Sequence, residues 1–404
     1  MSKHKWEFSA RFRRHAFGWR SNVPMQRIKE ALSEIRKEAR KNPVIAAEGA
    51  IILLEKLSPA LSHVDSSSGA IGSAVYYAIE ALVPIIAKPV VATEVRQQWI
   101  ERLWDALEDD NIPYIEHLEY FWGELCGTAE IASDWADKFI PVIKQMWERN
   151  SGCFEFFKGT IPCFSALFTA KRYDELLILL NKAPHKSWHF REWGIKALVA
   201  LNKPNDALKY AEDSHGLNVS SIAISRACEE ILLSMGMVEE AYREYALEAN
   251  LTSTNLSTFR AITKKYPDKE PSVILKDLIA SQPGSEGKWF AAAKNAGFFD
   301  LAIKLATQSP TDPHTLIRAA KEFSIKNPDF AIAAGMAGLH WIMLGYGYEV
   351  SSSDVLSAYG AIVDAAKVAS YDENQIKANI HKLIDQPNGL FIKRILQRYL
   401  EQGV

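Results

Sequence analysis

The side chains best suited to metal chemistry are two histidines in a short polar segment. His185 and His189 are four residues apart, so on a helix they share a face and can bind one metal ion. The sequence offers no third ligand at a recognisable spacing and no HExxH pattern. An exposed helix start is the simpler interpretation, so we expect no metal site.

The four cysteines, Cys126, Cys153, Cys163 and Cys228, show no metal-ligand spacing. Cys153 and Cys163 are close enough in sequence to pair with each other. However, the charged N-terminus lacks the apolar segment of a secretory signal, and disulfides persist mainly in exported proteins. We therefore expect reduced thiols in a core, and a cytoplasmic protein.

Two further polar groups have simple structural explanations. The loop from Asp65 to Gly69 precedes an expected helix, so its hydroxyl and N–H groups can hold an anion or cap the helix. Asp109 and Asp110 are adjacent and point to different faces, which makes them a poor acid–base pair. The chain contains no nucleophile-elbow, Walker, kinase or dinucleotide-binding pattern. We therefore expect no catalytic residue and no cofactor.

The first 41 residues form a basic segment rich in aromatic residues, with twelve Lys or Arg against four Glu. Arginines combined with aromatic rings suit phosphate contact and base stacking. Alternatively, the rings dock this arm on the rest of the protein while the arginines pair with its acids, or the arm contacts some other partner. The sequence leaves these interpretations open. From Pro24, apolar residues recur at helical spacing, which predicts an amphipathic helix. The candidate nucleic-acid-binding residues are Trp6, Arg11, Arg13, Arg14, Trp19 and Arg20.

Residues 101–137 reverse this charge, with eleven acids and one arginine, Arg102. Their aromatic residues predict a core between helices, and their acids predict a solvated face. The formal charge is +8 over residues 1–41 and −10 over residues 101–137, so the two segments attract each other within one chain or between two. This pattern favours self-docking, a homo-oligomer, or a basic partner on the acidic face.

The overall composition narrows the class of protein. The chain has 404 residues, of which 48% are hydrophobic, so it can bury a sizeable core. Its net charge of −2 argues against a molecule that binds nucleic acid over its whole surface. The best apolar run that we identify, Val44 to Leu54, is shorter than the roughly 18 residues of a membrane helix, so we expect no membrane partner. No useful length alternates with period two, which predicts an all-α protein.

Residues 166–249 contain three similar passages, each with an apolar helix, a turn residue, one or two acids and a second helix. The second helices open around Leu176, Ala207 and Ala241, at spacings of 31 and 34 residues. A recurrence near 34 residues built as helix–turn–helix is typical of tetratricopeptide solenoids. Further helix pairs continue at a shorter period up to about residue 345.

The region from about 160 to 345 resembles tetratricopeptide-like helical repeats in these turns. The tryptophan and glycine of that family's first helix are not at their usual offsets, since Trp193 and Gly194 are adjacent here. The resemblance implies a right-handed α-solenoid of antiparallel helix pairs whose groove holds a segment of another protein. The aromatic residues expected to contact this partner are Trp188, Trp193, Tyr210, Tyr242 and Tyr245.

The sequence predicts four parts. Residues 1–42 form the basic arm and first amphipathic helix, and residues 43–150 form a HEAT-like helical region. Residues 151–345 form the tetratricopeptide-like repeats, and residues 346–404 form a C-terminal helical cap. The predicted function is a non-catalytic scaffold or adaptor for protein–protein interaction, of the kind found in multi-protein assemblies. The alternative is a nucleic-acid-associated protein that uses the basic arm.

Overall fold

The computed structural model describes residues 4–148, 157–216 and 219–401, and these residues contain helices and no strand. The all-α architecture expected from the sequence is confirmed. The chain divides into two compact units, Met1–Met237 and Val238–Val404, a division that the sequence did not reveal. The predicted break at residues 150–152 and Cys153 lie outside the described residues, so the four-part division and the Cys153–Cys163 pairing stay predictions.

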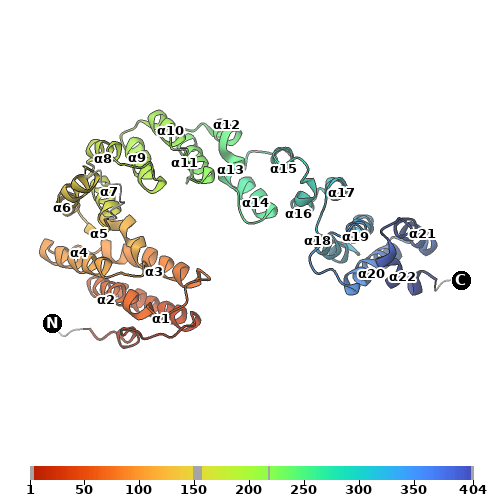
Figure 1. The fold of residues 1–404 in the computed structure, drawn as a ribbon, viewed down its shortest axis with the longest axis horizontal. Helices are drawn as coiled ribbons and strands as arrows, with labels where there is room; N and C mark the ends of the chain where they lie inside the picture. The colour runs from red at the N-terminus through yellow and green to blue at the C-terminus, as the bar shows by residue number, and fades with distance from the viewer. Residues whose placement is uncertain (1–3, 149–156, 217–218, 402–404) are drawn as a thin grey trace. The chain divides into compact units, whose positions relative to one another are not determined.

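The first unit is a succession of helices joined by short turns (Figure 1). Its elements are η1 (Phe8–Ala10), α1 (Asn22–Ala39), α2 (Pro43–Leu61), α3 (Ala70–Ala87), α4 (Thr93–Glu108), η2 (Glu116–Phe121), α5 (Trp122–Cys126), α6 (Ala129–Glu148), α7 (Thr160–Thr169), α8 (Tyr173–Asn181), α9 (Trp188–Ala200), α10 (Pro204–Glu212) and α11 (Ser221–Ser234).

The second unit continues the same helix–turn–helix pattern and ends in the helix that was expected to cap it. One turn of π-helix, η3, interrupts its first helix. Its elements are α12 (Val238–Ala241), η3 (Tyr242–Ala246), α13 (Leu247–Ala249), α14 (Asn255–Lys265), α15 (Pro271–Ala280), η4 (Glu286–Trp289), α16 (Phe290–Asn295), α17 (Phe299–Gln308), α18 (Pro313–Phe323), α19 (Pro328–Met343), α20 (Ser352–Val368), α21 (Glu373–Ile384) and α22 (Leu390–Glu401).

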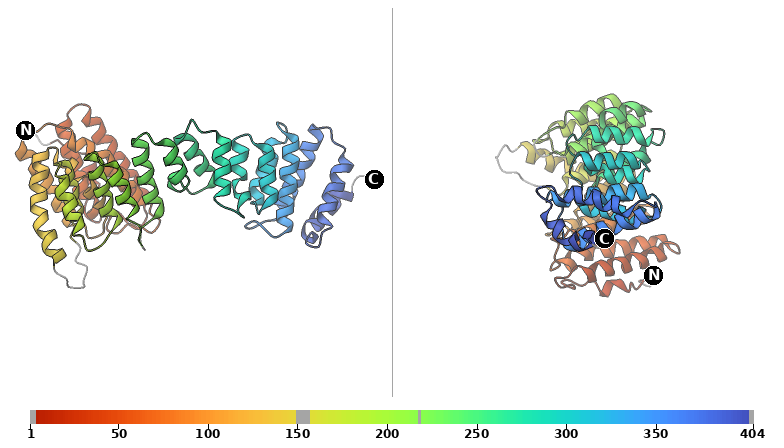
Figure 2. Two further views of the ribbon diagram at one scale, coloured as in Figure 1. Left: turned by 90° about the horizontal axis from the view of Figure 1, so that it is seen from above. Right: turned by 90° about the vertical axis from the view of Figure 1, so that its right-hand side faces the viewer.

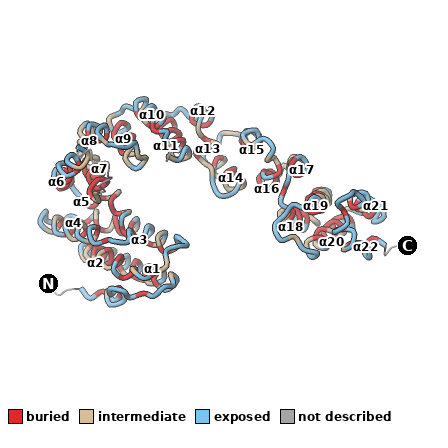
Figure 3. Tube along the Cα trace, in the orientation of Figure 1, coloured by how far each residue is buried: buried red, intermediate tan, exposed pale blue. Residues whose placement is uncertain are grey.

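Packing within each unit is between helices that are near neighbours in sequence. Each helix contacts mainly the next helix and the next but one, as in the stacks α7–α9–α11 and α18–α19–α20. Figure 2 shows helices of neighbouring colour lying side by side in the second unit. The buried residues lie where the helices face one another, and the exposed residues lie on the outer surfaces (Figure 3). This one-dimensional packing is that of an α-solenoid, so the predicted α-solenoid of helix pairs is confirmed within each unit.

Four of the turns between helices share one backbone conformation and one hydrogen bond. Lys171, Asn202, Gly236 and Gly297 all have a positive φ, between 58° and 81°. In each case the N–H of the following residue donates to the carbonyl five residues earlier, at 2.9 to 3.0 Å. This is the hydrogen bond that closes a helix with a left-handed residue. A regular turn therefore underlies the recurrence in the sequence, even where glycine is absent.

The basic arm docks on the first helices. Trp6, Phe8, Phe12 and Phe17 are buried in the same core as α1 and α2. The carboxylate of Glu34 accepts the backbone N–H groups of residues 7 and 8 at 2.8 and 3.1 Å. The docking interpretation is therefore correct for these rings, and Trp6 is withdrawn from the candidate nucleic-acid-binding set because its ring is covered.

Helix α3 is a longer apolar segment than the run from Val44 to Leu54 that was identified as the best in the sequence. Ala70–Ala87 is 18 residues long with a mean hydropathy of 1.7, so by length and composition it can cross a membrane. In the structure it packs against α1, α2 and α5, as a core helix does. Pro84 lies inside this helix, three residues before its last residue.

The acidic segment is only partly a solvated face. Asp110 and Glu119 are 4% and 8% exposed, contrary to the expectation that its acids are solvated. Asp110 is held by the backbone N–H groups of Tyr114 and Ile115 at 3.3 and 2.8 Å. Burial raises the pKa of Glu119 to about 8, because the charged carboxylate is poorly solvated there. The predicted aromatic core is confirmed, since Trp99, Trp122 and Trp135 are buried.

Candidate protein-binding groove

A groove of about 480 Å³ opens along the first unit between α9 and α11, with one residue from α7 at its edge. We call it the α9–α11 groove. Its volume suits a few side chains of a bound segment. It is lined by Phe168, Trp188, Glu192, Ile195, Lys196, Val199, Ala200, Ala223, Arg226, Ala227, Glu230, Ile231 and Ser234.

Helical spacing explains how the two helices line this groove. On α9, residues 188, 192, 195, 196 and 199 recur at three or four positions and so lie on one face. On α11, residues 223, 226, 227, 230, 231 and 234 do the same. Ala223 and Ala227 are small, so α11 leaves space opposite the larger side chains of α9. The opposite side of α9 carries Trp193, Ala197 and Leu198, which are buried.

The groove combines an apolar floor with four charged side chains of both signs. Glu192 and Lys196 come from α9, and Arg226 and Glu230 come from α11. Burial raises the pKa of Glu192, against the opposing effects of Lys196 and His189. The ammonium of Lys196 lies 4.3 Å from the centre of the Trp193 ring. A bound segment would therefore meet apolar surface flanked by charges.

The three predicted partner-binding residues of the first unit lie in three different environments. Trp188 is half-buried and lines the groove, and its contact with a partner stays a prediction. Trp193 is only 4% exposed, so the expectation that it contacts a partner is wrong and its ring packs in the core. Tyr210 is partly buried between Gly194 and Arg191, whose guanidinium lies 3.3 Å from the ring centre. Its ring wedges α10 against α9 and does not line the groove.

The two tyrosines predicted in the second unit lie on the π-helical turn η3. Tyr242 is 7% exposed, and its hydroxyl donates to the carboxylate of Asp277 at 2.6 Å. Lys269 covers the Tyr242 ring at 4.3 Å, so the expectation that this tyrosine contacts a partner is wrong. Tyr245 is partly exposed, and its role in binding stays a prediction.

The histidine pair that suggested a metal site is used differently. The Nδ1 atom of His189 lies 2.6 Å from the hydroxyl of Tyr120, and that contact orients its ring. Among the residues that the structure describes, no three His, Cys, Asp or Glu side chains gather as metal ligands would. Cys126 and Cys163 are buried, and burial raises the pKa of both thiols. This environment favours the unreactive thiol over the thiolate.

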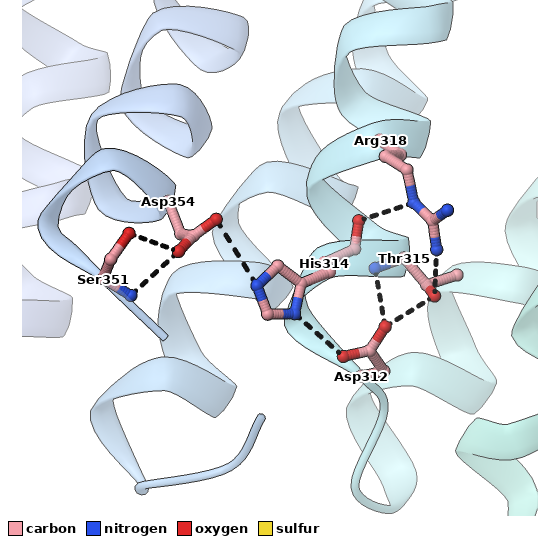
Figure 4. Close-up of polar contacts among 6 residues, drawn as sticks. All are labelled: Asp312, His314, Thr315, Arg318, Ser351 and Asp354. Atoms are coloured by element: carbon pink, nitrogen blue, oxygen red, sulfur yellow. Dashed lines mark hydrogen bonds and ion pairs between the residues drawn. The ribbon is translucent and has the colours of Figure 1, made fainter. Parts of the chain in front are cut away.

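A polar cluster in the second unit was not anticipated from the sequence. The ring of His314 lies between two carboxylates, with Nδ1 3.4 Å from Asp312 and Nε2 3.4 Å from Asp354 (Figure 4). Asp354 also accepts the hydroxyl of Ser351 at 2.7 Å, and Asp312 accepts the hydroxyl of Thr315 at 2.7 Å. Each carboxylate thus caps a helix start, α20 and α18 respectively.

This cluster is not arranged for nucleophilic catalysis. In a catalytic triad the histidine contacts the serine hydroxyl directly. Here the carboxylate of Asp354 stands between Ser351 and His314 (Figure 4). The N–H and hydroxyl of Ser351 lower the pKa of Asp354, while the hydrogen bonds from Thr315 lower the pKa of Asp312 against the opposing effect of burial. The arrangement links the starts of two helices.

No family model matches the chain, and no curated protein matches it. One solved structure that matches is the crystal structure of the APC/C hetero-tetramer Cut9-Hcn1, at 12% identity over 94% of this chain and 88% of that chain. The TM-score of this match is 0.20.

Proposed function

We propose that this protein is a non-catalytic helical-repeat scaffold that holds one amphipathic segment of a partner protein in the α9–α11 groove. The observation that supports this most is the groove itself, where an apolar floor is left uncovered along two stacked helices. Stacked helical repeats commonly present such extended surfaces to partners. A place in a multi-protein assembly and a cytoplasmic location are part of the same proposal.

The lining of the groove defines the chemistry of the partner. A single apolar side chain of the partner can enter beside Ala223 and Ala227, against Ile195 and Trp188. Flanking basic and acidic residues of the partner would then meet Glu192 and Arg226, respectively. An amphipathic helix with an apolar anchor and charges of both signs on its flanks meets these requirements. Most of the binding energy should come from the anchor, because few interface residues usually dominate.

Two groove variants and one control test the proposal. Trp188→Ala removes apolar contact, and Ala200→Trp fills the groove from an exposed position. Ile178→Ala is the control, because Ile178 is 59% exposed on α8 and does not line the groove. Proteins captured with the wild-type chain are identified, and the segment that binds is synthesised and titrated by calorimetry.

The proposal predicts that both groove variants weaken the titrated segment at least tenfold, while the control binds as the wild type does. Equal binding by all four proteins would refute the groove as the site. Sedimentation of the isolated protein tests the separate expectation of a homo-oligomer. If the captured segment is the chain's own, the attraction of its opposite charges for each other becomes the simplest explanation.

A further inference from the structure

The docked arm leaves one large aromatic ring uncovered. Trp19 is 71% exposed, although the other aromatic residues of the arm are buried. Three arginines, Arg13, Arg14 and Arg20, are also exposed within the same eight residues. We call these four residues the arm patch. An exposed indole beside guanidinium groups is the composition that single-stranded nucleic acid recognises by stacking and phosphate contact.

The backbone of the arm patch is held in place by the first unit. The N–H of His15 donates to the carbonyl of Pro59 at 2.9 Å, and the ring of His15 lies 4.6 Å from that of His63. The N–H of Asp65 donates to the carbonyl of Trp19 at 2.9 Å. These contacts fix the chain on both sides of the patch. These side chains therefore project from an ordered backbone, which lowers the entropic cost of ordering them when a ligand binds.

The charge of the arm patch is left uncompensated by the neighbouring acids. Glu30 is already paired with two other arginines, and Glu34 accepts two backbone N–H groups. Within the described residues, no carboxylate lies within 4.0 Å of the guanidinium groups of Arg13, Arg14 or Arg20. Asp65, whose own N–H binds the carbonyl of Trp19, accepts the N–H of Ser67 on its carboxylate at 3.0 Å. The three positive charges are available to a ligand.

We propose that the arm patch binds single-stranded nucleic acid, with Trp19 stacking on a base and Arg13, Arg14 and Arg20 contacting phosphates. Seven residue steps separate Arg13 from Arg20, which limits the patch to about 25 Å. That length matches a short site of about four nucleotides, at the small end of known single-strand sites. This activity is independent of the α9–α11 groove. Of the six nucleic-acid-binding residues predicted from the sequence, the structure removes two. Trp6 is buried, and Arg11 pairs with Glu30 at 2.7 Å.

Fluorescence anisotropy of a labelled 12-nucleotide oligo-dT with the full chain tests the proposal, at several salt concentrations. Trp19→Ala should weaken binding about tenfold to a hundredfold, and Trp19→Phe should restore most of the loss, since a phenyl ring also stacks. Replacing the three arginines by glutamine should reduce the slope of log K against log salt by about 2, since each single-strand phosphate contact contributes about 0.7. A duplex of the same length should bind more weakly.

A matched control separates this site from general charge attraction. Arg36, Lys37 and Arg40 are exposed near the end of α1, and replacing them by glutamine removes the same charge elsewhere. The proposal predicts a smaller loss for this control than for the arm-patch variant. It is overturned if no saturable binding occurs at 50 mM salt, if Trp19→Ala binds like the wild type, or if the control loses as much. Because all these side chains are exposed, thermal melts should show that every variant is folded.

Discussion

Replacing Gly49 by alanine tests whether the arm is an integral part of the first unit. Gly49 lies inside α2, and the ring of Trp6 packs directly on it. A Cβ atom at this position would lie 2.2, 2.5 and 2.7 Å from three atoms of that ring. Carbon atoms in ordinary contact are about 3.5 to 4.0 Å apart, so the ring must leave its site.

The expected magnitude follows from two opposing effects. In an exposed helix interior, replacing glycine by alanine stabilises a protein by about 1 kcal/mol. Loss of a buried tryptophan side chain costs about 3 to 5 kcal/mol, and the Trp6 ring is 6% exposed. Gly49→Ala should therefore destabilise the first unit by about 2 to 4 kcal/mol. In the Trp6→Ala background the same change should become stabilising, by about 1 kcal/mol.

Urea unfolding followed by circular dichroism measures these differences, and trypsin cleavage at the arginines of the arm reports undocking. Both Gly49→Ala and Trp6→Ala should accelerate cleavage within residues 11–20. Gly123→Ala is not a suitable control, because a Cβ there would lie 2.3 Å from a backbone carbonyl oxygen. Gly72→Ala is suitable, since it lies in α3 and its Cβ would have no atom within 4 Å. The docking account is refuted if Gly49→Ala stabilises the protein as Gly72→Ala does and leaves cleavage unchanged.

Two further predictions concern turn geometry and a buried acid. Lys171→Gly and Asn202→Gly should each stabilise the protein by up to about 1 kcal/mol in thermal unfolding, because both residues have a φ of 58°, whereas Lys171→Ala should bring no gain. Glu119 should make stability fall as pH rises from about 4.5 to about 8, because the folded state holds its proton while the unfolded state releases it. The full effect is at most about 5 kcal/mol, and Glu119→Gln should flatten this part of the pH profile of urea unfolding. A profile that Glu119→Gln does not change would contradict the burial of a protonated carboxyl group.

The sequence predicted the helix pairs because their signal is local. Apolar periodicity, prolines at first helical turns and a recurring left-handed turn residue are all short-range features, and they predicted the succession of helix pairs and the C-terminal helices. Packing between neighbours then follows, since a solenoid requires few long-range contacts. The boundary at Met237 and Val238 was missed because the turn there looks like the other turns in sequence.

The site was less predictable because it depends on which face of a helix is covered. Trp188 and Trp193 are both on α9, but they are five residues apart and so lie on different faces of the helix. The Trp188 ring lines the groove, and the Trp193 ring is in the core. Single-sequence periodicity cannot decide which apolar face meets a neighbour when both faces of α9 are apolar. The alanines Ala223 and Ala227 were the missed signal, since small residues facing large ones on the neighbouring helix leave a hollow.

The most direct test of the proposed groove is amide hydrogen exchange of the full chain with and without its captured partner segment. Binding in the α9–α11 groove predicts slower exchange in Trp188–Ala200 and Ser221–Ser234, with little change in α18 to α22. Protection confined to the second unit or to the outer helices α8 and α10, with none on α9 and α11, would contradict it.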